Sequence, residues 1–180
     1  IVGHREIDPG QVEELGSGIV RLIDSVGSQL GAGQERSSID QRRDLTLRFL
    51  SALAPGADQI GARAMLDRQA KAKEGEATWQ LEAVLPFALD DYADEIARDI
   101  AQRGGSAGDQ AKATQAMREL AGKARRVLEM ADWRPGDGDS ALDGHRRARR
   151  YATLGQMVVR QADLIIALWG GGPPGGMGGT

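Results

Sequence analysis

The sequence predicts an α/β protein with a Rossmann-like, doubly wound and mostly parallel β-sheet that carries helices on both faces. Segments with the periodicity of strands alternate along the chain with segments that have the periodicity of helices, and this is the order of βαβ units. The last strand-like segment is a continuous apolar run, and residues 45–53 carry apolar side chains on both faces, as in strands that are buried on both faces of a parallel sheet. No internal repeat interrupts this order.

The first helix is predicted to begin at Pro9. Asp8 is a suitable N-cap, proline is favoured at the first helical position, and Gln11 follows at the third. Apolar residues then recur at steps of three and four positions, which predicts one buried helix face. These residues are Val12, Leu15, Ile19, Leu22, Val26 and Leu30.

A strand and a helix follow an irregular polar loop over residues 31–41. Residues 45–53 alternate with period two, with larger apolar side chains on one face and Leu50 and Ala52 on the other. Both faces are therefore expected to be buried, as in a parallel sheet. The sequence APGAD then turns the chain into an alanine-rich helix over residues 60–72.

The next strand is predicted over residues 81–87, where Pro86 stops it. Residues 89–102 are expected to form a helix, because acidic residues in its first turn complement the positive end of the helix dipole. A second helix is expected over residues 110–124. Residues 126–130 could end that helix or form a short strand.

The last predicted elements are a helix and a central strand. Ser140 and Asp143 resemble a capping box that opens a helix reaching about residue 161. The apolar run over residues 163–169 predicts a central, parallel strand.

Composition excludes several classes of protein. The chain has 180 residues, no cysteine, two histidines and a formal net charge of −3. The charge argues against a dedicated nucleic-acid surface, and the lack of cysteine excludes disulfides and thiolate metal sites. The histidines lie far apart in the sequence, so we expect no metal site. Without a long apolar run or a signal-peptide pattern, we expect a cytoplasmic protein with no membrane partner.

Residues 1–180 are expected to form one domain. Ile1 and Val2 are too few to make a strand, although the residues after them are typical of the exit from one. Thr180 lies where a helix N-cap would lie. We therefore expect both ends of the domain to continue beyond this sequence.

Four segments follow predicted strands. They are residues 3–5, 55–58 and 86–87 and the tail after Trp169, in which glycine takes seven of the eleven positions 170–180. In open α/β sheets, ligands bind outside the carboxyl ends of the strands, near the point where the strand order reverses. These segments are therefore the candidate ligand site.

The same four segments carry a resemblance to a known superfamily. The motifs "GHR", "LAPGADQIGARA", "LPF" and "DLIIALWGGGPPGGMGGT" appear in this order after the predicted strands. Together they resemble the SLOG superfamily, named for the DNA-processing protein Smf and the "lonely guy" phosphoribohydrolases, over nearly the whole chain. The resemblance implies a Rossmann-like fold, often dimeric, that binds nucleotides or nucleotide-derived signals. Some members stand alone, and others are sensor modules joined to effector domains.

The residues of these segments also suit an anion site on physical grounds. A strand that enters a glycine-rich turn and then a helix directs unpaired N–H groups at one point, where the helix dipole adds positive potential. Gly56 and Ala57 are small enough to let a phosphate approach the backbone, and residues 175–180 could form a second cradle. The alternatives are a tight strand-to-helix connection at APGAD and a linker in the tail.

We expect no catalytic residue, and we expect the ligand to contact residues from all four segments. The predicted contacts are Gly3, His4, Arg5, Gly56, Ala57, Asp58, Pro86, Phe87, Trp169, Gly170, Gly175, Gly176, Gly178, Gly179 and Thr180.

Individual roles follow from the chemistry of each side chain. Arg5 can pair with a phosphate in a bidentate manner, and His4 can contact a base or ribose or be an inert buried histidine. Asp58 can accept hydrogen bonds from a ribose hydroxyl or compensate the helix dipole. Phe87 and Trp169 can flank a base or belong to the core.

The basic run "HRRARRY" over residues 145–151 is interpreted as a solvated helix face from which one arginine could reach the site. Its arginines point in several directions on a helix, and there is little aromatic interleaving for nucleic-acid stacking. The sequence "DGDSALD" lacks the ligand spacing of a calcium loop and is read as a turn and cap.

The resemblance leaves enzymatic activity in doubt. In the phosphoribohydrolases, an arginine on the helix before the last of these strands and a glutamate in the motif PGGxGTxxE carry the chemistry. The position of that arginine falls on Leu154 here, with Arg150 one helical turn away, and the glutamate would lie beyond Thr180.

Three functions from different classes therefore stand. The first is a ligand-sensing module that binds a nucleotide, AMP-like or ADP-ribose-like, and acts on a fused or associated effector domain. The second is a phosphoribohydrolase of nucleoside monophosphates, and the third is a protein that processes single-stranded DNA. A homodimer is implied by the resemblance alone.

Overall fold

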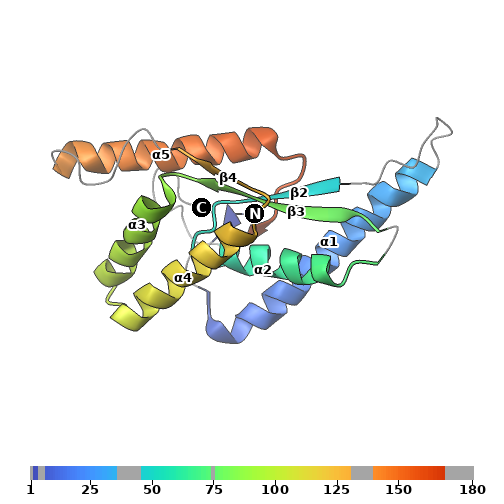
Figure 1. Cartoon of the computed structure of the whole chain (residues 1–180), viewed down its shortest axis with the longest axis horizontal. Helices are drawn as coiled ribbons and strands as arrows, with labels where there is room; N and C mark the ends of the chain where they lie inside the picture. The colour runs from blue at the N-terminus through green and yellow to red at the C-terminus, as the bar shows by residue number, and fades with distance from the viewer. Residues whose placement is uncertain (1, 4–6, 36–45, 74–75, 131–139, 169–180) are drawn as a thin grey trace.

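The computed structural model describes residues 2–3, 7–35, 46–73, 76–130 and 140–168 (Figure 1). A short 3₁₀ helix, η1, spans Pro9–Gln11 and leads into the first α-helix. The helices are α1 (Val12–Glu35), α2 (Ala57–Ala70), α3 (Leu89–Gln102), α4 (Ala107–Lys123) and α5 (Ser140–Gln161). The strands are β1 (Val2–Gly3), β2 (Thr46–Ser51), β3 (Thr78–Leu85), β4 (Arg126–Glu129) and β5 (Ala167–Leu168).

The predicted α/β fold with parallel strands is confirmed. β2, β3 and β4 pair in this order, and all of their pairings are parallel. β1 and β5 form a second parallel pair, in which Val2 lies opposite Ala167 and Gly3 opposite Leu168. Residues 126–130, whose structure the sequence left open between helix and strand, contain β4.

The helices lie on both faces of the sheet (Figure 1). On one face, α1, α2, α3 and α4 pack against β2 and β3 and form the larger apolar cluster, which includes Phe49, Leu53 and Leu81. On the other face, α5 packs against the sheet, and Leu154 meets Val84. The two-sided burial predicted for residues 45–53 is found only in part. Phe49 is buried on one face, and Leu50 and Ala52 are partly buried on the α5 side. Thr46 and Arg48, at the start of the strand, are exposed.

The apolar face predicted for the first helix is only partly buried. Ile19 is buried as expected, and so is Ile23, which the pattern did not include. Leu22 and Leu30 are 41% and 45% exposed, and Val12 is exposed as well. The helix meets the sheet and α2 along a narrower stripe than the sequence periodicity indicates, and part of its apolar face lies along a groove.

The last predicted strand is also shorter than expected. Of residues 163–168, only Ala167 and Leu168 are paired, and their partner is the two-residue β1. Ladder hydrogen bonds require a neighbouring strand, and the residues before Ala167 have none among the described residues.

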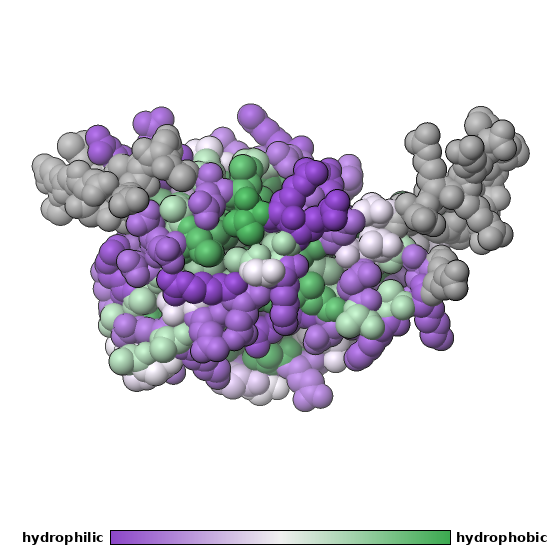
Figure 2. Space-filling view, in the orientation of Figure 1, coloured by the Kyte–Doolittle hydropathy of each residue, from purple (hydrophilic) through white to green (hydrophobic). Residues whose placement is uncertain are grey.

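β4 forms one edge of the three-stranded sheet, and all four of its residues are exposed. Val127 and Leu128 contribute apolar surface there. Figure 2 shows an apolar area in the upper middle of this view, where Figure 1 draws β4 and α5. None of the helices in the described part of the chain is both long enough and apolar enough to cross a membrane.

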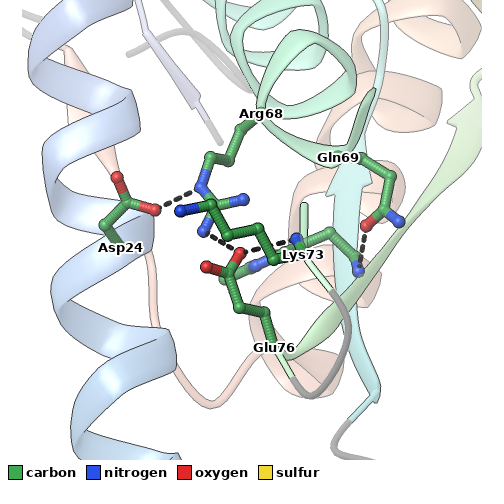
Figure 3. A network of polar contacts seen from close by, with 6 residues as sticks. Asp24, Arg68, Gln69, Lys73 and Glu76 are labelled. Carbon is green, nitrogen blue, oxygen red and sulfur yellow. Dashed lines mark hydrogen bonds and ion pairs between the residues drawn. The ribbon is translucent and has the colours of Figure 1, made fainter. Parts of the chain in front are cut away.

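A polar network joins α1, α2 and the loop before β3 (Figure 3). The Arg68 guanidinium bonds to the Asp24 carboxylate through Nε, and its Nη2 donates to Glu76 Oε2 at 2.7 Å. The Lys73 amide also donates to Glu76 Oε2, and Gln69 Oε1 accepts a hydrogen bond from the Trp79 amide. These contacts fix the path from α2 to β3.

The lowered pKa values of two carboxylates predict how the stability of the fold depends on pH. The Arg68 hydrogen bond, followed by that of the Lys73 amide, lowers the pKa of Glu76. The hydroxyl and amide of Ser106 lower the pKa of Asp109 in the capping box of α4. Because both pKa values fall on folding, the stability that they contribute is present above the unfolded pKa of about 4 and is lost as pH falls through the folded pKa. We expect the melting temperature to be level from about pH 7 to 5 and to drop below about pH 4.

The melting temperature of the Glu76→Gln variant should fall less on acidification than that of the native chain. Thermal melts between pH 7 and 2.5 measure the difference. Glu13→Gln, which removes an exposed carboxylate from α1, is the matched control. Identical pH profiles for the two variants would contradict the role given to Glu76.

Candidate functional site

The turn between β2 and α2, residues 53–57, has an unusual backbone. Leu53 has a φ of 56°, and Gly56 has a φ of 86° and a ψ of −128°. A left-handed φ is uncommon at leucine, and the Gly56 conformation is one that glycine adopts far more readily than other residues. Such backbone persists only where the surrounding structure holds it, and it is frequent at ligand sites.

Two buried polar side chains hold this turn. Ser51 Oγ accepts a hydrogen bond from the Leu53 amide at 3.1 Å and donates to the Asp58 carbonyl at 3.4 Å. Gln59 Nε2 donates to the carbonyls of Leu53 and Ala113, at 3.2 and 3.3 Å. The turn is thus tied to the end of β2, to α2 and to α4.

The first turn of α2 is buried but has no side-chain cap. Its N-cap is Gly56, which offers no side chain, and Ala57 is 0% exposed. The amides of Gln59 and Ile60 bond to the carbonyls of Ala54 and Gly56, whereas the earliest amides of a helix have no intrahelical acceptor. By contrast, α4 begins with a complete capping box of Ser106 and Asp109. The start of α2 is therefore suited to a hydrogen-bond acceptor from outside the helix.

Gly3 brings the end of β1 against this turn. A Cβ added at Gly3 would lie 2.6 Å from Ala57 Cβ, 2.6 Å from the Leu168 carbonyl oxygen and 2.9 Å from Leu168 Cβ. Three segments that are distant in the sequence therefore meet at one point: the ends of β1 and β5 and the start of α2.

This point lies where the chain, having passed outward through the three-stranded sheet, turns back, although β1 and β5 form a pair that is separate from β2–β3–β4 among the described residues. From β2 the chain proceeds outward through β3 and β4, and α5 then crosses the other face of the sheet to reach β5 beside β1 (Figure 1). In open parallel sheets the crevice at such a reversal is the usual place for a ligand. The described members of the predicted site that lie here are Gly3, Gly56, Ala57 and Asp58.

Asp58 is 7% exposed in the first turn of α2. Its carbonyl accepts the weak hydrogen bond from Ser51. A carboxylate in the first turn interacts favourably with the positive end of the helix dipole. The contact of Asp58 with a ribose hydroxyl stays a prediction.

Pro86 and Phe87, which follow β3, lie inside the molecule. Both are fully buried, and the Phe87 ring packs against Tyr92 at 6.4 Å and edge-on against Tyr151 at 5.8 Å between ring centroids. The structure thus gives Phe87 a packing role, and stacking on a base stays a prediction. The nearby start of α3 is capped, because the Leu89 amide donates to Glu129 Oε1 at 3.1 Å.

One arginine of the basic run on α5 reaches another helix. Arg147 Nη1 lies 2.9 Å from Glu95 Oε1, and Arg98 Nη1 lies 2.7 Å from Glu95 Oε2. The Glu95 side chain is only 4% exposed. Arg147 thus neutralises a buried carboxylate and joins α5 to α3.

The remaining predicted site residues lie outside the described residues. They are His4, Arg5, Trp169, Gly170, Gly175, Gly176, Gly178, Gly179 and Thr180. Their roles stay predictions.

Leu154, which the resemblance aligns with the arginine of the phosphoribohydrolases, is a core residue. It is 5% exposed and packs with Val84 and Val158 between α5 and the sheet. In the described part of the chain, no group of three or more histidine, cysteine, aspartate or glutamate side chains is placed to hold a metal ion.

Sequence reasoning missed the residues that shape the turn: Ser51, Leu53 and Gln59. A weak signal existed for Ser51, a hydroxyl between the apolar residues Leu50 and Ala52, and for Gln59, a long amide inside an alanine-rich helix. Nothing in the sequence pointed to a left-handed leucine.

Comparisons with known proteins give no further guide. No family model, no curated protein and no solved structure matches this chain.

Proposed function

We propose that this protein binds the phosphate of a nucleotide or nucleotide-derived molecule at the junction of β1, β5 and the β2–α2 turn, and that it acts as a ligand-sensing module. The observation that carries the proposal is the buried and uncapped start of α2, which follows a turn with glycine-specific backbone at Gly56.

Electrostatics support an anion at this place. The start of a helix carries a partial positive charge and unpaired N–H donors, and phosphate groups satisfy both. Because Gly56 has no side chain and Ala57 has only a methyl group, an oxygen can approach the backbone closely. Arg5, two residues after the end of β1, is expected to supply a bidentate pair to the same phosphate.

Binding without hydrolysis is favoured by Leu154. A buried leucine in contact with Val84 cannot stabilise a leaving group or a sugar cation, so the chain lacks the arginine that the phosphoribohydrolases use at this position. The parallel α/β fold agrees with membership of the SLOG superfamily, which remains part of this proposal. A phosphoribohydrolase is the second candidate, and the experiment below separates the two.

We expect a nucleotide to raise the melting temperature of the chain. The panel is AMP, ADP, ADP-ribose, NAD and cyclic nucleotides, with chromatography of each mixture after incubation. A ligand at a hundred times its dissociation constant stabilises the native state by about 2.7 kcal/mol, which corresponds to a shift of roughly 5–10 °C for a domain of this size. Recovery of the intact nucleotide indicates a sensor, whereas release of the free base indicates the hydrolase.

The Arg5→Gln variant should lose most of the shift, because the phosphate loses its charged partner. Arg21→Gln, which removes an exposed arginine from α1, is the matched control and should keep the full shift. If no nucleotide shifts the melting temperature, or if both variants respond alike, the proposal is wrong.

A further inference from the structure

β4 offers an open strand edge on the side of the three-stranded sheet opposite to β2. β3 pairs with one side of β4, and no other strand among the described residues pairs with it. All four residues of β4, Arg126–Glu129, are exposed, and so is Arg125 before them. The side of β4 away from β3 therefore presents backbone N–H and C=O groups to which a further strand can bond.

The register with β3 fixes which way the side chains of β4 point. Val127 lies beside Ala83, a member of the larger apolar cluster, and Leu128 lies beside Val84, which packs on the α5 side. Residues side by side in register share a face of the sheet, and successive residues along a strand alternate between faces. The α5 face therefore carries Arg126 and Leu128, and the opposite face carries Arg125, Val127 and Glu129.

Two copies of β4 can pair about a two-fold axis in a few registers only. The strands are then antiparallel, and directly opposite residues share a face of the sheet. Because the axis keeps each face on its own side, a residue lies opposite its own copy or opposite a residue an even number of positions away. A register centred on Arg126 or on Glu129 sets like charges directly opposite one another, which is destabilising. Registers centred on Val127 or on Leu128 remain.

Charge complementarity selects the register centred on Val127. Val127 then lies opposite its own copy, and Arg125 of each copy lies opposite Glu129 of the other. Two pairs of opposite charge thus flank an apolar contact on one face, and on the other face Leu128 lies against the aliphatic part of Arg126. The register centred on Leu128 instead sets Glu129 against Val127 and forms no such pair.

The Glu129 side chain is already held in position for this contact. Its Oε1 accepts a hydrogen bond from the Leu89 amide, at the start of α3, at 3.1 Å. A carboxylate has two oxygens that accept hydrogen bonds, so Oε2 can accept from Arg125 of a second copy. Because the rotamer is restricted beforehand, the pairing costs Glu129 less side-chain entropy than it would cost an unrestrained carboxylate.

We propose that β4 is a homodimer interface, at which a second copy of this chain pairs antiparallel with β4 in the register centred on Val127. The two three-stranded sheets then form one sheet that is continuous across both copies. Val127 and Leu128, which are 40% and 46% exposed, become buried at its centre. An edge of this length buries little surface, so the dimer is weak and reversible. The interface lies two strands from β2 and is independent of the proposed phosphate site.

Sedimentation equilibrium of the native chain at roughly 5–500 µM tests for a weak dimer. We expect reversible association between monomer and dimer. Arg125→Glu should weaken it at least about tenfold, because both pairs with Glu129 become pairs of like charge. Arg126→Glu changes the net charge by the same amount on the other face of the strand, so it is the matched control. Its dissociation constant should stay within about threefold of the native value.

A mixture of two variants tests the register itself. Arg125→Glu and Glu129→Arg should each associate weakly alone, because each homodimer has like charges opposite one another. A heterodimer of the two has opposite charges at both pairs, so the mixture should associate within about threefold of the native chain. Glu129→Arg also removes the acceptor of the Leu89 amide, so a thermal melt of that variant checks its fold. The comparison of Arg125→Glu with Arg126→Glu stands without it.

Three results would overturn the proposal. One is a native chain that stays monomeric up to about 500 µM. Another is a dimer that Arg125→Glu and Arg126→Glu weaken alike, or a mixture of folded swapped variants that associates no better than either alone. The third is a dimer that Leu164→Lys dissociates, because Leu164 is 55% exposed in the groove between α1 and the residues before β5 and the interface would then lie there.

Discussion

We expect the Gly3→Ala variant to unfold roughly 5–10 °C below the native chain, a loss of about 2–3 kcal/mol. The added Cβ would lie 2.6 Å from the Leu168 carbonyl oxygen and 2.6 Å from Ala57 Cβ. Neither neighbour is the end of a flexible side chain, so β1 must move away from β5 or from α2. The three segments of the proposed site would separate, and nucleotide binding would weaken along with stability.

Thermal melts and ligand titrations of the same sample measure both effects. Gly155→Ala is the matched control, because a Cβ at Gly155 in α5 meets nothing within 4 Å. Alanine is the better helix former, so this control should be as stable as the native chain or slightly more stable. A Gly3→Ala variant with native stability would show that β1, β5 and α2 do not pack as closely as described.

The second large loss of stability is expected when the Glu95 carboxylate loses one of its arginine partners. Arg147→Ala should lower stability by about 1–3 kcal/mol, because it leaves a carboxylate that is 4% exposed with one cationic partner in place of two. Arg149→Ala, which changes an exposed neighbour on the same helix, is the control and should fall within about 0.5 kcal/mol of the native chain.

A double-mutant cycle assigns this effect to the pair. Glu95→Gln and Arg147→Ala should each destabilise the chain, and their combination should cost about 1–2 kcal/mol less than the sum of the two. Additive losses would mean that the contact between α3 and α5 carries no energy of its own. Urea unfolding curves of the four proteins supply the numbers.

The sequence predicted the fold class because periodicity and turn chemistry agree along most of the chain. Residues 45–53 show two apolar faces, and the structure places Phe49 and Leu50 in clusters on opposite sides of the sheet. The strand predicted at residues 163–169 is shorter in the structure, since strand length depends on a neighbour that no local pattern reveals. Leu22 and Leu30 fit a buried helix face by period, but burial depends on what lies opposite them.

The sequence indicates where the candidate site lies, which stays a prediction, but it does not reveal how the turn between β2 and α2 is built. Gly56 and the general location follow from the strand-to-helix turn. The roles of Ser51 and Gln59 depend on contacts with Leu53, Asp58 and Ala113, and the last of these is 54 positions away from Gln59. Glu95 could have been noticed as a charged residue among the buried Tyr92 and Ile96 of α3, but its partner on α5 could not.

The most direct test of the account is the backbone amide of Ala57, followed by ¹⁵N NMR while AMP or ADP-ribose is added to the full chain. A phosphate at the start of α2 predicts a saturable shift of the Ala57 amide. The Ala107 amide, at the capped start of α4, should stay in place. If nucleotide binds while the Ala57 amide does not move, or if no nucleotide moves it at any concentration, the proposed phosphate site is wrong.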